Sequence, residues 1–149
     1  MELSKDLREF VELLNSRKIK YLLVGGHAVG FHGHPRYTGD VDFLIDTSPE
    51  NAARLAAAVS DFGFGSLGLQ EADFRAPAMV IQLGRAPNRI DLLTSVAAVS
   101  FEEAWKTRVE TRLGGLPVWV ISKDLLVQNK LAAARPQDLA DVAKLREIK

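Results

Sequence analysis

The segment GGHAVGFHGHPRYTGDVDFLID, residues 25–46, combines a pair of glycines with two aspartates that stand one residue apart. Gly25 and Gly26 close a short apolar run, and this pattern predicts a buried strand that enters a tight turn. Asp40 and Asp42 lie at the start of a second apolar run, which predicts another strand. Because side chains two positions apart in a strand share a face, we expect both carboxylates to point the same way.

Two carboxylates on one face of a strand repel each other, and a divalent cation between them relieves that repulsion. Mg²⁺ binds one or two protein carboxylates and completes its shell with waters and substrate phosphates, so the arrangement suits phosphoryl chemistry. In the alternative interpretation both groups are solvated. Asp40 then caps a turn, and Asp42 lies on the surface where the strand begins.

The glycine pair also has two interpretations. A strand followed by a Gly-Gly step and a helix presents free backbone N–H groups, which bind phosphate at the helix N-terminus without a lysine. In that case Gly26 permits the phosphate to approach closely. The alternative is a plain tight turn, and the pair matches neither GxxxxGK[ST] nor GxGxxG.

A third acidic residue, Asp91, lies within the strand-like run 89–93. Burying an unpaired carboxylate is costly, so one interpretation makes Asp91 an edge residue paired with Arg89 or Arg85. In the other, its strand abuts the first two strands. Asp91 then supplies a third carboxylate, which completes a two-metal site or deprotonates an attacking hydroxyl. Asp46 precedes Thr-Ser-Pro at a helix entry and is interpreted as structural.

Helical and strand patterns alternate along the rest of the chain and predict an α/β (α+β) fold with a mixed sheet flanked by helices. The segment 63–75 is predicted to be a loop. Strands are expected at 21–24, 41–45, 78–83, 89–93, 109–113 and 116–121, the last four as two hairpins. Helices are expected from the cap Ser4 to 16–17, at 27–31, 49–62 and 101–106 (cap Ser100), at 122–134 and from Pro136 onward, with Leu139, Val142 and Leu145 on one face.

The composition is that of an ordinary globular protein. The chain has 149 residues, 47% of them hydrophobic and 26% charged, with no repeat or long linker, so we expect a single domain over residues 1–149. No apolar run is long enough to cross a membrane, and the polar N-terminus does not resemble a secretory signal, so a cytoplasmic location is expected. The absence of cysteine excludes disulfides and thiolate metal sites.

Positive and negative charges balance, with 19 Lys and Arg residues against 19 Asp and Glu residues. There is thus no global positive field of the kind that attracts nucleic acid. A polynucleotide partner would need a local basic patch. The candidates for that patch are Arg85, Arg89, Lys123, Lys130 and Arg135.

Taken together, Gly25-Gly26, Asp40-Val41-Asp42 and Asp91 resemble the nucleotidyltransferase superfamily with a DNA polymerase beta type of core. That superfamily shows a strand, a Gly-Gly or Gly-Ser step, a D-x-D and a distant third Asp. The segment from the glycines to the D-x-D resembles more closely a minimal branch that includes abortive-infection-type (AbiEii-like) toxin nucleotidyltransferases and aminoglycoside nucleotidyltransferases. SKDLLVQNKLAAARPQDLADVAKL, residues 122–145, is similar to the helical C-terminal end of the toxin-like branch.

The resemblance implies a role for each residue of the pattern. Asp40 and Asp42 are implied to bind Mg²⁺ or Mn²⁺, and Asp91 to be the third metal ligand or the base. Gly25 and Gly26 are implied to hold the triphosphate of an NTP. Many members of the superfamily have serine after the first glycine, whereas this chain offers only backbone donors there.

Further residues are implied to bind the nucleotide. Arg36 and Thr38, which precede the D-x-D in a loop, are candidates for phosphate contact, with turn stabilisation as the alternative. Lys130 lies on an apolar helical face, so it either reaches the nucleotide phosphates or snorkels to solvent. Asp138 and Asp141 lie in the first turns of the last helix, where the helix dipole favours negative charge, and are interpreted as structural.

The three histidines do not form a metal pattern. His27 and His32 would lie on different faces of a helix, and Gly33 and Pro35 interrupt the approach to His34, so we expect no zinc site. His27, beside the glycine pair, either contacts nucleotide or caps the helix.

The implied activity is metal-dependent transfer of a nucleoside monophosphate from an NTP to an acceptor hydroxyl, with release of pyrophosphate. The acceptor stays open among tRNA, a protein and a small molecule. The alternative is a non-catalytic nucleotide-binding module, or one component of a toxin–antitoxin pair with a cognate protein partner. A purely structural or oligomerisation domain would leave the three aspartates unexplained.

Overall fold

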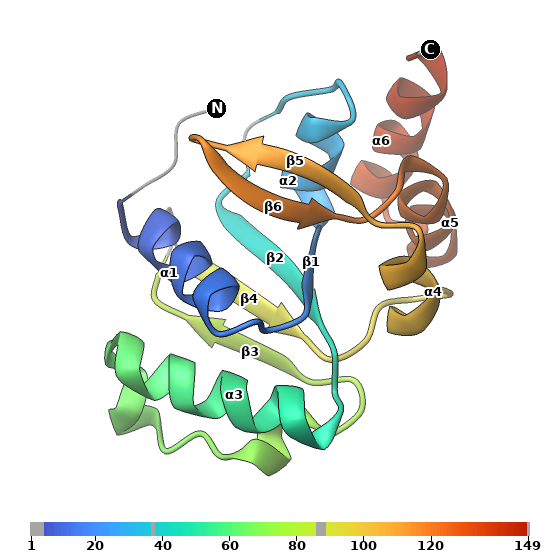
Figure 1. The fold of residues 1–149 in the computed structure, drawn as a ribbon. Coiled ribbons are helices and arrows are strands. Elements are labelled where there is room, and N and C mark those ends of the chain that lie inside the picture. Colours follow the sequence, from blue (N-terminus) through green and yellow to red (C-terminus); the bar gives the residue numbers. More distant parts are fainter. Residues whose placement is uncertain (1–4, 37, 86–88, 149) are drawn as a thin grey trace.

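The computed structural model describes residues 5–36, 38–85 and 89–148. These residues form one six-stranded mixed sheet with the strand order β3-β4-β2-β1-β6-β5 (Figure 1). Its strands are β1 (Tyr21–Val24), β2 (Asp40–Ile45), β3 (Val80–Leu83), β4 (Arg89–Leu93), β5 (Val109–Leu113) and β6 (Leu116–Val120). β2 pairs with β4 in parallel and with β1 in antiparallel orientation, and β1 pairs with β6 in parallel.

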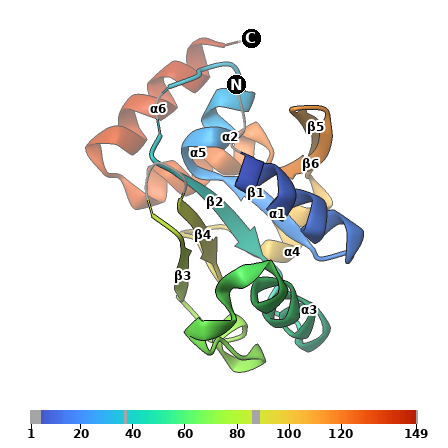
Figure 2. The ribbon, with the colours of Figure 1, turned by 90° about the vertical axis from the view of Figure 1, so that its left-hand side faces the viewer.

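The helices lie around this sheet (Figure 2). They are α1 (Lys5–Ser16), α2 (Gly25–Phe31), α3 (Pro49–Val59), α4 (Phe101–Lys106), α5 (Lys123–Ala133) and α6 (Pro136–Glu147). α5 and α6 pack on each other, and α2 contacts α5. On the side of α1, the ring of Phe43 in β2 lies 6.4 Å from that of Phe10 and 5.5 Å from that of Tyr21, all three fully buried.

Local capping explains why several helices begin where they do. Ser48, Ser100 and Ser122 precede α3, α4 and α5, and each side chain accepts a hydrogen bond from a backbone N–H of the first turn. Pro49 and Pro136 occupy the first turns of α3 and α6, where a missing N–H costs nothing. The expected cap Ser100 and the expected positions of Pro49 and Pro136 are confirmed, whereas the expected cap Ser4 lies outside the described residues.

The predicted α/β fold with a mixed sheet is confirmed, and the differences are local. α2 begins at Gly25 rather than at residue 27, so the glycine pair forms the first turn of this helix. Segments 60–67 and 71–74, partly expected to be loop, form short π and 3₁₀ turns. The predicted turn at 86–88 lies outside the described residues.

Leu139 corrects the prediction for the last helix. Val142 and Leu145 are buried there, but Leu139 is 48% exposed. A spacing of three residues falls short of one helical turn by about 60°, so Leu139 lies about 120° around the helix from Leu145. Among the described helices, none combines the length and the apolar character that crossing a membrane requires.

Candidate functional site

The pairing of β2 with both β1 and β4 brings the predicted acidic residues together. Asp42 is in register with Asp91 of β4 and with Val24 of β1. Asp40, Asp42 and Asp91 each offer a carboxylate oxygen, and these oxygens lie within 4.8 Å of one another. Asp91 is not on an edge strand, because β3 lies outside β4. The structure therefore has the arrangement in which the strand of Asp91 adjoins the pair of predicted strands, where it lies next to β2.

Arg89 lies against two of these three carboxylates. Its Nε lies 2.9 Å from Oδ1 of Asp91, and its Nη2 lies 2.9 Å from Oδ2 of Asp40. The side chain of Asp91 is only 7% exposed. Asp91 thus has both partners that the sequence offered as alternatives, namely Arg89 and the neighbouring strand. One guanidinium compensates the charge of two buried or half-buried carboxylates.

Asp42 is the carboxylate of the cluster without an arginine partner in the described structure. Burial, followed by the negative charges of Asp40 and Asp91, raises the pKa of Asp42 to about 7. Burial also opposes the ionisation of Asp40, but hydrogen bonds with Asp91 and Arg89 outweigh it and lower the pKa of Asp40. Burial and the contact with Asp40 raise the pKa of Asp91 despite Arg89. A hard divalent cation fits this donor set because it supplies the positive charge that Asp42 lacks.

The glycine pair is explained by close packing on both sides. Gly25 has a φ of +68°, and a Cβ there would lie 3.1 Å from Cγ of Asp42. At Gly26 a Cβ would lie 3.1 Å from Cβ of Thr38 and 3.2 Å from Nη2 of Arg36. The lack of a side chain at Gly25 therefore lets Asp42 pack against the start of α2. The lack of one at Gly26 lets Arg36 and Thr38, in the loop before β2, pack against the same turn.

Arg36 and Thr38 make contacts that stabilise this loop. The Thr38 hydroxyl donates to the carbonyl of Asp40 at 3.0 Å. Nε and Nη2 of Arg36 donate to the two carboxylate oxygens of Asp141, each at 2.9 Å. The structure thus places both side chains in the turn-stabilising role that the sequence offered as an alternative, and phosphate contact stays a prediction.

Lys130 is buried in an ion-pair network between α5 and α6, so the snorkelling interpretation is wrong. Its Nζ lies 3.2 Å from Asp138 and 2.9 Å from Asp141, and the residue is 4% exposed. Arg135 donates to Asp138 through its backbone N–H and its guanidinium. Burial disfavours the charge of Asp141, but contacts with Arg36 and Lys130 outweigh it and lower the pKa of Asp141. Asp138 and Asp141 make ion pairs within the helical pair, which agrees with the structural interpretation.

A cavity of about 190 Å³ opens beside the carboxylate cluster. Gly25, Asp42 and Lys130 all line it, whereas Arg36 and Thr38 are not among the described lining residues. Asn129, which sequence reasoning missed, and Arg135, which it named only for a nucleic-acid patch, also line this cavity. Their position beside Lys130 and at the start of the R-P-x-D motif was the available signal.

Asn129 also positions one wall of this cavity. Its side-chain amide donates to the carbonyl of Ala97 at 3.0 Å, and Gln128 donates to Ala98 at 2.7 Å. These bonds tie the segment after β4 to α5. Ala97 itself lines the cavity, so this wall is held from the side of α5.

The remaining sequence candidates have structural partners. Burial lowers the pKa of His27, against the opposing charge of Asp40. A ring nitrogen of His32 lies 2.7 Å from the carbonyl oxygen of Ile121. Asp46 accepts hydrogen bonds from the backbone and the hydroxyl of Ser48, as expected for a structural residue.

The cations proposed as a nucleic-acid patch are mostly paired. Lys123 donates to the carbonyl of Ile148 at 2.6 Å. Arg89, Lys130 and Arg135 contact carboxylates. Arg135 stays 76% exposed despite its ion pair, so a basic patch stays a prediction, with part of its charge compensated by neighbouring carboxylates.

Comparisons with known proteins agree on one family and fold. A family model described as a nucleotidyltransferase of unknown function (DUF6036) matches residues 1–147. No curated protein matches the sequence.

Several solved structures share the fold. The lincosamide antibiotic adenylyltransferase LnuA, solved with lincomycin bound, is 15% identical with a TM-score of 0.62, over 99% of each chain. ANT(2″)-Ia, solved with adenylyl-2″-tobramycin, is 15% identical with a TM-score of 0.59, over 93% of this chain and 84% of that one. An antigenic nucleotidyltransferase-like protein from Paracoccidioides brasiliensis is 20% identical with a TM-score of 0.57, over 97% and 78% of the two chains.

Proposed function

This chain belongs to the DUF6036 family of nucleotidyltransferases, and from that premise we propose that it transfers a nucleoside monophosphate from an NTP to an acceptor hydroxyl. The acceptor oxygen forms a bond to the α-phosphorus, the bond from that phosphorus to the bridging oxygen breaks, and pyrophosphate leaves. The observation that carries the proposal is the carboxylate cluster, whose Asp42 also lines a cavity with Gly25 and Lys130.

In this proposal Asp40, Asp42 and Asp91 hold Mg²⁺ or Mn²⁺. A bound ion supplies charge neutralisation at the triphosphate and lowers the pKa of the acceptor hydroxyl. Asp91 acts as a ligand or accepts the hydroxyl proton. Its buried position and its hydrogen bonds to Arg89 fix its carboxylate in one orientation.

Gly25 and Lys130 position the phosphates in this proposal. Gly25 begins α2 and lines the cavity, so the N-terminus of this helix faces the space where the phosphates would lie. Lys130 has three N–H donors, and two carboxylates hold it at the cavity wall. A lysine held in this way has its N–H donors already oriented at the cavity wall, so a phosphate oxygen can accept from it without the entropic cost of ordering a free side chain.

We favour a small molecule as the acceptor. The structures of LnuA and ANT(2″)-Ia were solved with lincomycin and with an adenylylated tobramycin, respectively. In this chain, most of the cations that could have bound tRNA are paired with carboxylates or carbonyls. Both observations favour a compact hydroxylated acceptor over a large polyanion.

Transfer of label from α-³²P NTPs tests the proposal. The protein is incubated with Mg²⁺, each NTP in turn, and separate small-molecule, RNA and protein fractions of a cell lysate. We expect label to pass from one NTP to the small-molecule fraction, and to stay on the NTP with Asp40→Asn. Labelling that persists in this variant would rule out the cluster as the catalytic centre.

One observation favours the non-catalytic alternative, a nucleotide-binding module. Arg89 already supplies positive charge to Asp40 and Asp91, and a metal would have to share or displace it. Calorimetry with Mg²⁺ and each NTP separates the two proposals when it is run beside the transfer assay. Nucleotide binding without release of pyrophosphate would favour the module.

A further inference from the structure

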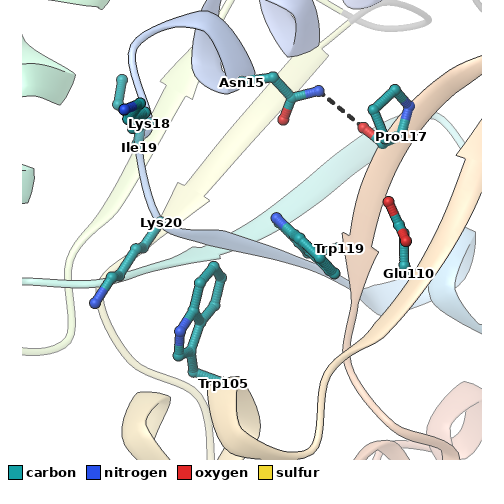
Figure 3. Close-up of a pocket in the computed structure, with 8 residues that line it drawn as sticks. All are labelled: Asn15, Lys18, Ile19, Lys20, Trp105, Glu110, Pro117 and Trp119. Atoms are coloured by element: carbon teal, nitrogen blue, oxygen red, sulfur yellow. Dashed lines mark hydrogen bonds between the residues drawn. The ribbon is translucent and has the colours of Figure 1, made fainter.

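A second cavity, of about 430 Å³, lies beside the start of β1 (Figure 3). Lys20 in its wall immediately precedes β1, whereas Gly25 of the carboxylate site follows the other end of that strand. The two cavities share no described lining residue. A ligand here would therefore be separate from the proposed nucleotidyl transfer. The volume is in the range of about 300–1,000 Å³ that is usual for small-molecule sites.

Two indole rings form part of its wall and are held rigidly by their neighbours. The centroids of Trp105 and Trp119 lie 6.0 Å apart with an interplanar angle of 67°. The guanidinium of Arg108 lies 3.9 Å and 4.5 Å from these two centroids, and Phe101 stacks on Trp105 at 5.7 Å. Aromatic surfaces fixed in this way bind a flat ligand at a low cost in conformational entropy.

Charged groups of opposite sign flank the indoles. Figure 3 shows Lys18 and Lys20 on one side of the two tryptophans and Glu110 on the other. Lys20 Nζ lies 5.6 Å from the Trp105 ring centroid. Within the described part of the chain, none of these three charged groups forms an ion pair with another side chain. The cavity thus combines an anion-binding side, a stacking surface and a hydrogen-bond acceptor.

Lys18 lines this cavity at a backbone position where a lysine is strained. Lys18 has a φ of +56° at the end of α1, where Ile19 N–H donates to Leu14 and Lys18 N–H to Asn15. Glycine is the residue that this left-handed position favours, because it has no Cβ. A lysine there costs stability, and Lys18 is one of the residues that line the cavity.

We propose that this cavity binds a nucleoside monophosphate whose base carries an exocyclic amine. The base stacks on Trp119 and meets the inclined ring of Trp105 with its edge, the phosphate pairs with Lys18 and Lys20, and the amine donates to Glu110. Each part of the ligand thereby meets a group of the complementary chemistry.

Tryptophan fluorescence provides a specific test, because the chain has only two tryptophans and both line this cavity. We would titrate adenosine 5′-monophosphate without divalent metal and expect saturable quenching. Inosine 5′-monophosphate, which lacks the amine, should bind about threefold to tenfold more weakly, as expected for one lost hydrogen bond. Adenosine lacks the phosphate and ribose 5-phosphate lacks the base. Each compound should therefore quench the fluorescence only weakly. Absence of saturable quenching, or equal quenching by ribose 5-phosphate, would overturn the proposal.

Lys18→Gly separates ligand binding from folding. It relieves the strained backbone and removes one ammonium, so we expect a higher melting temperature together with weaker quenching by adenosine 5′-monophosphate. Ala78→Gly is the matched control, since Ala78 also has a positive φ, of +54°, and does not line the cavity. Ala78→Gly should raise the melting temperature and leave the quenching by adenosine 5′-monophosphate unchanged. Unchanged affinity in Lys18→Gly would contradict the proposal.

Two more variants locate the bound ligand. Glu110→Gln should reduce the preference for adenosine over inosine monophosphate, because an amide can also donate to the inosine carbonyl. Asp42→Asn alters only the carboxylate site, so it should leave the quenching unchanged. Loss of quenching in Asp42→Asn would place the ligand at the carboxylate site and refute a separate cavity.

Discussion

Arg89 donates to both Asp40 and Asp91, and it therefore competes with any metal for the same oxygens. Replacing it with Gln removes one positive charge from the cluster. We expect Arg89→Gln to bind Mn²⁺ about tenfold more tightly, because the variant removes a positive charge that competes with the ion for the same oxygens. Calorimetry without nucleotide measures this, and Arg85→Gln at an exposed arginine is the matched control. Equal or weaker affinity in Arg89→Gln would mean that Arg89 supports the metal site.

Asp42 gives the site a defined pH dependence. Its pKa of about 7 lies above the ordinary value, so the folded state holds its proton more tightly than the unfolded state. The stabilisation from this proton is complete below the ordinary pKa of about 4 and is lost as the pH rises through about 7. In EDTA, the melting temperature of the wild type relative to Asp42→Asn should therefore fall between pH 5 and pH 8. A constant difference across this range would contradict the assigned pKa.

Gly25 has two independent reasons to be glycine. Its φ is +68°, and a Cβ would collide with Asp42. Gly68 has a similar φ of +65° but nothing within 4 Å of the added Cβ. Gly25→Ala should therefore cost about 1–2 kcal/mol of backbone strain and in addition displace Asp42 and weaken Mn²⁺ binding. Gly68→Ala should cost the strain alone, as measured by urea unfolding and metal titration. Equal metal affinity in both variants would show that the close contact of Gly25 with Asp42 does not affect the metal site.

At the scale of elements, α6 is held in place by buried charge. Lys130 contacts Asp138 and Asp141, whose side chains are 3% and 0% exposed. Lys130→Met leaves two buried carboxylates with fewer partners and should lower the free energy of unfolding by about 3 kcal/mol. Lys106→Met removes an ion pair with Glu102 whose side chains are 72% and 82% exposed. The control should change stability by less than about 1 kcal/mol, and a similar loss in both variants would contradict the structural role of Lys130.

The elements differ in how well their sequences predict them. The sequence predicts β5 and β6 with nearly the observed bounds, because two short strand-like segments on either side of Gly114-Gly115 encode a hairpin locally. The partner of Arg36 was not predictable in this way. Arg36 pairs with Asp141 from the last helix, and nothing near either residue in sequence specifies that contact. The burial of Lys130 was not predictable for the same reason. A lysine on an apolar helical face can either extend to solvent or turn inward, and the local sequence pattern does not distinguish the two.

At the scale of the whole molecule, strand order is what creates the site. Asp42 and Asp91 become neighbours because β4 pairs with β2 in parallel, after the chain has passed through α3 and β3. The sequence indicated three carboxylates of the right kind, and the family resemblance indicated that they meet. The parallel pairing itself, and the presence of Arg89 between Asp40 and Asp91, needed the three-dimensional structure.

The most direct test of the central claim is pyrophosphate release by the wild type and by Asp42→Asn, measured side by side with Mg²⁺ and the NTP and acceptor identified by labelling. We predict release that depends on both metal and acceptor in the wild type. The variant should release pyrophosphate only at background rate while its circular dichroism spectrum stays unchanged. Equal release by the two folded proteins would show that the chemistry does not take place at the carboxylate cluster.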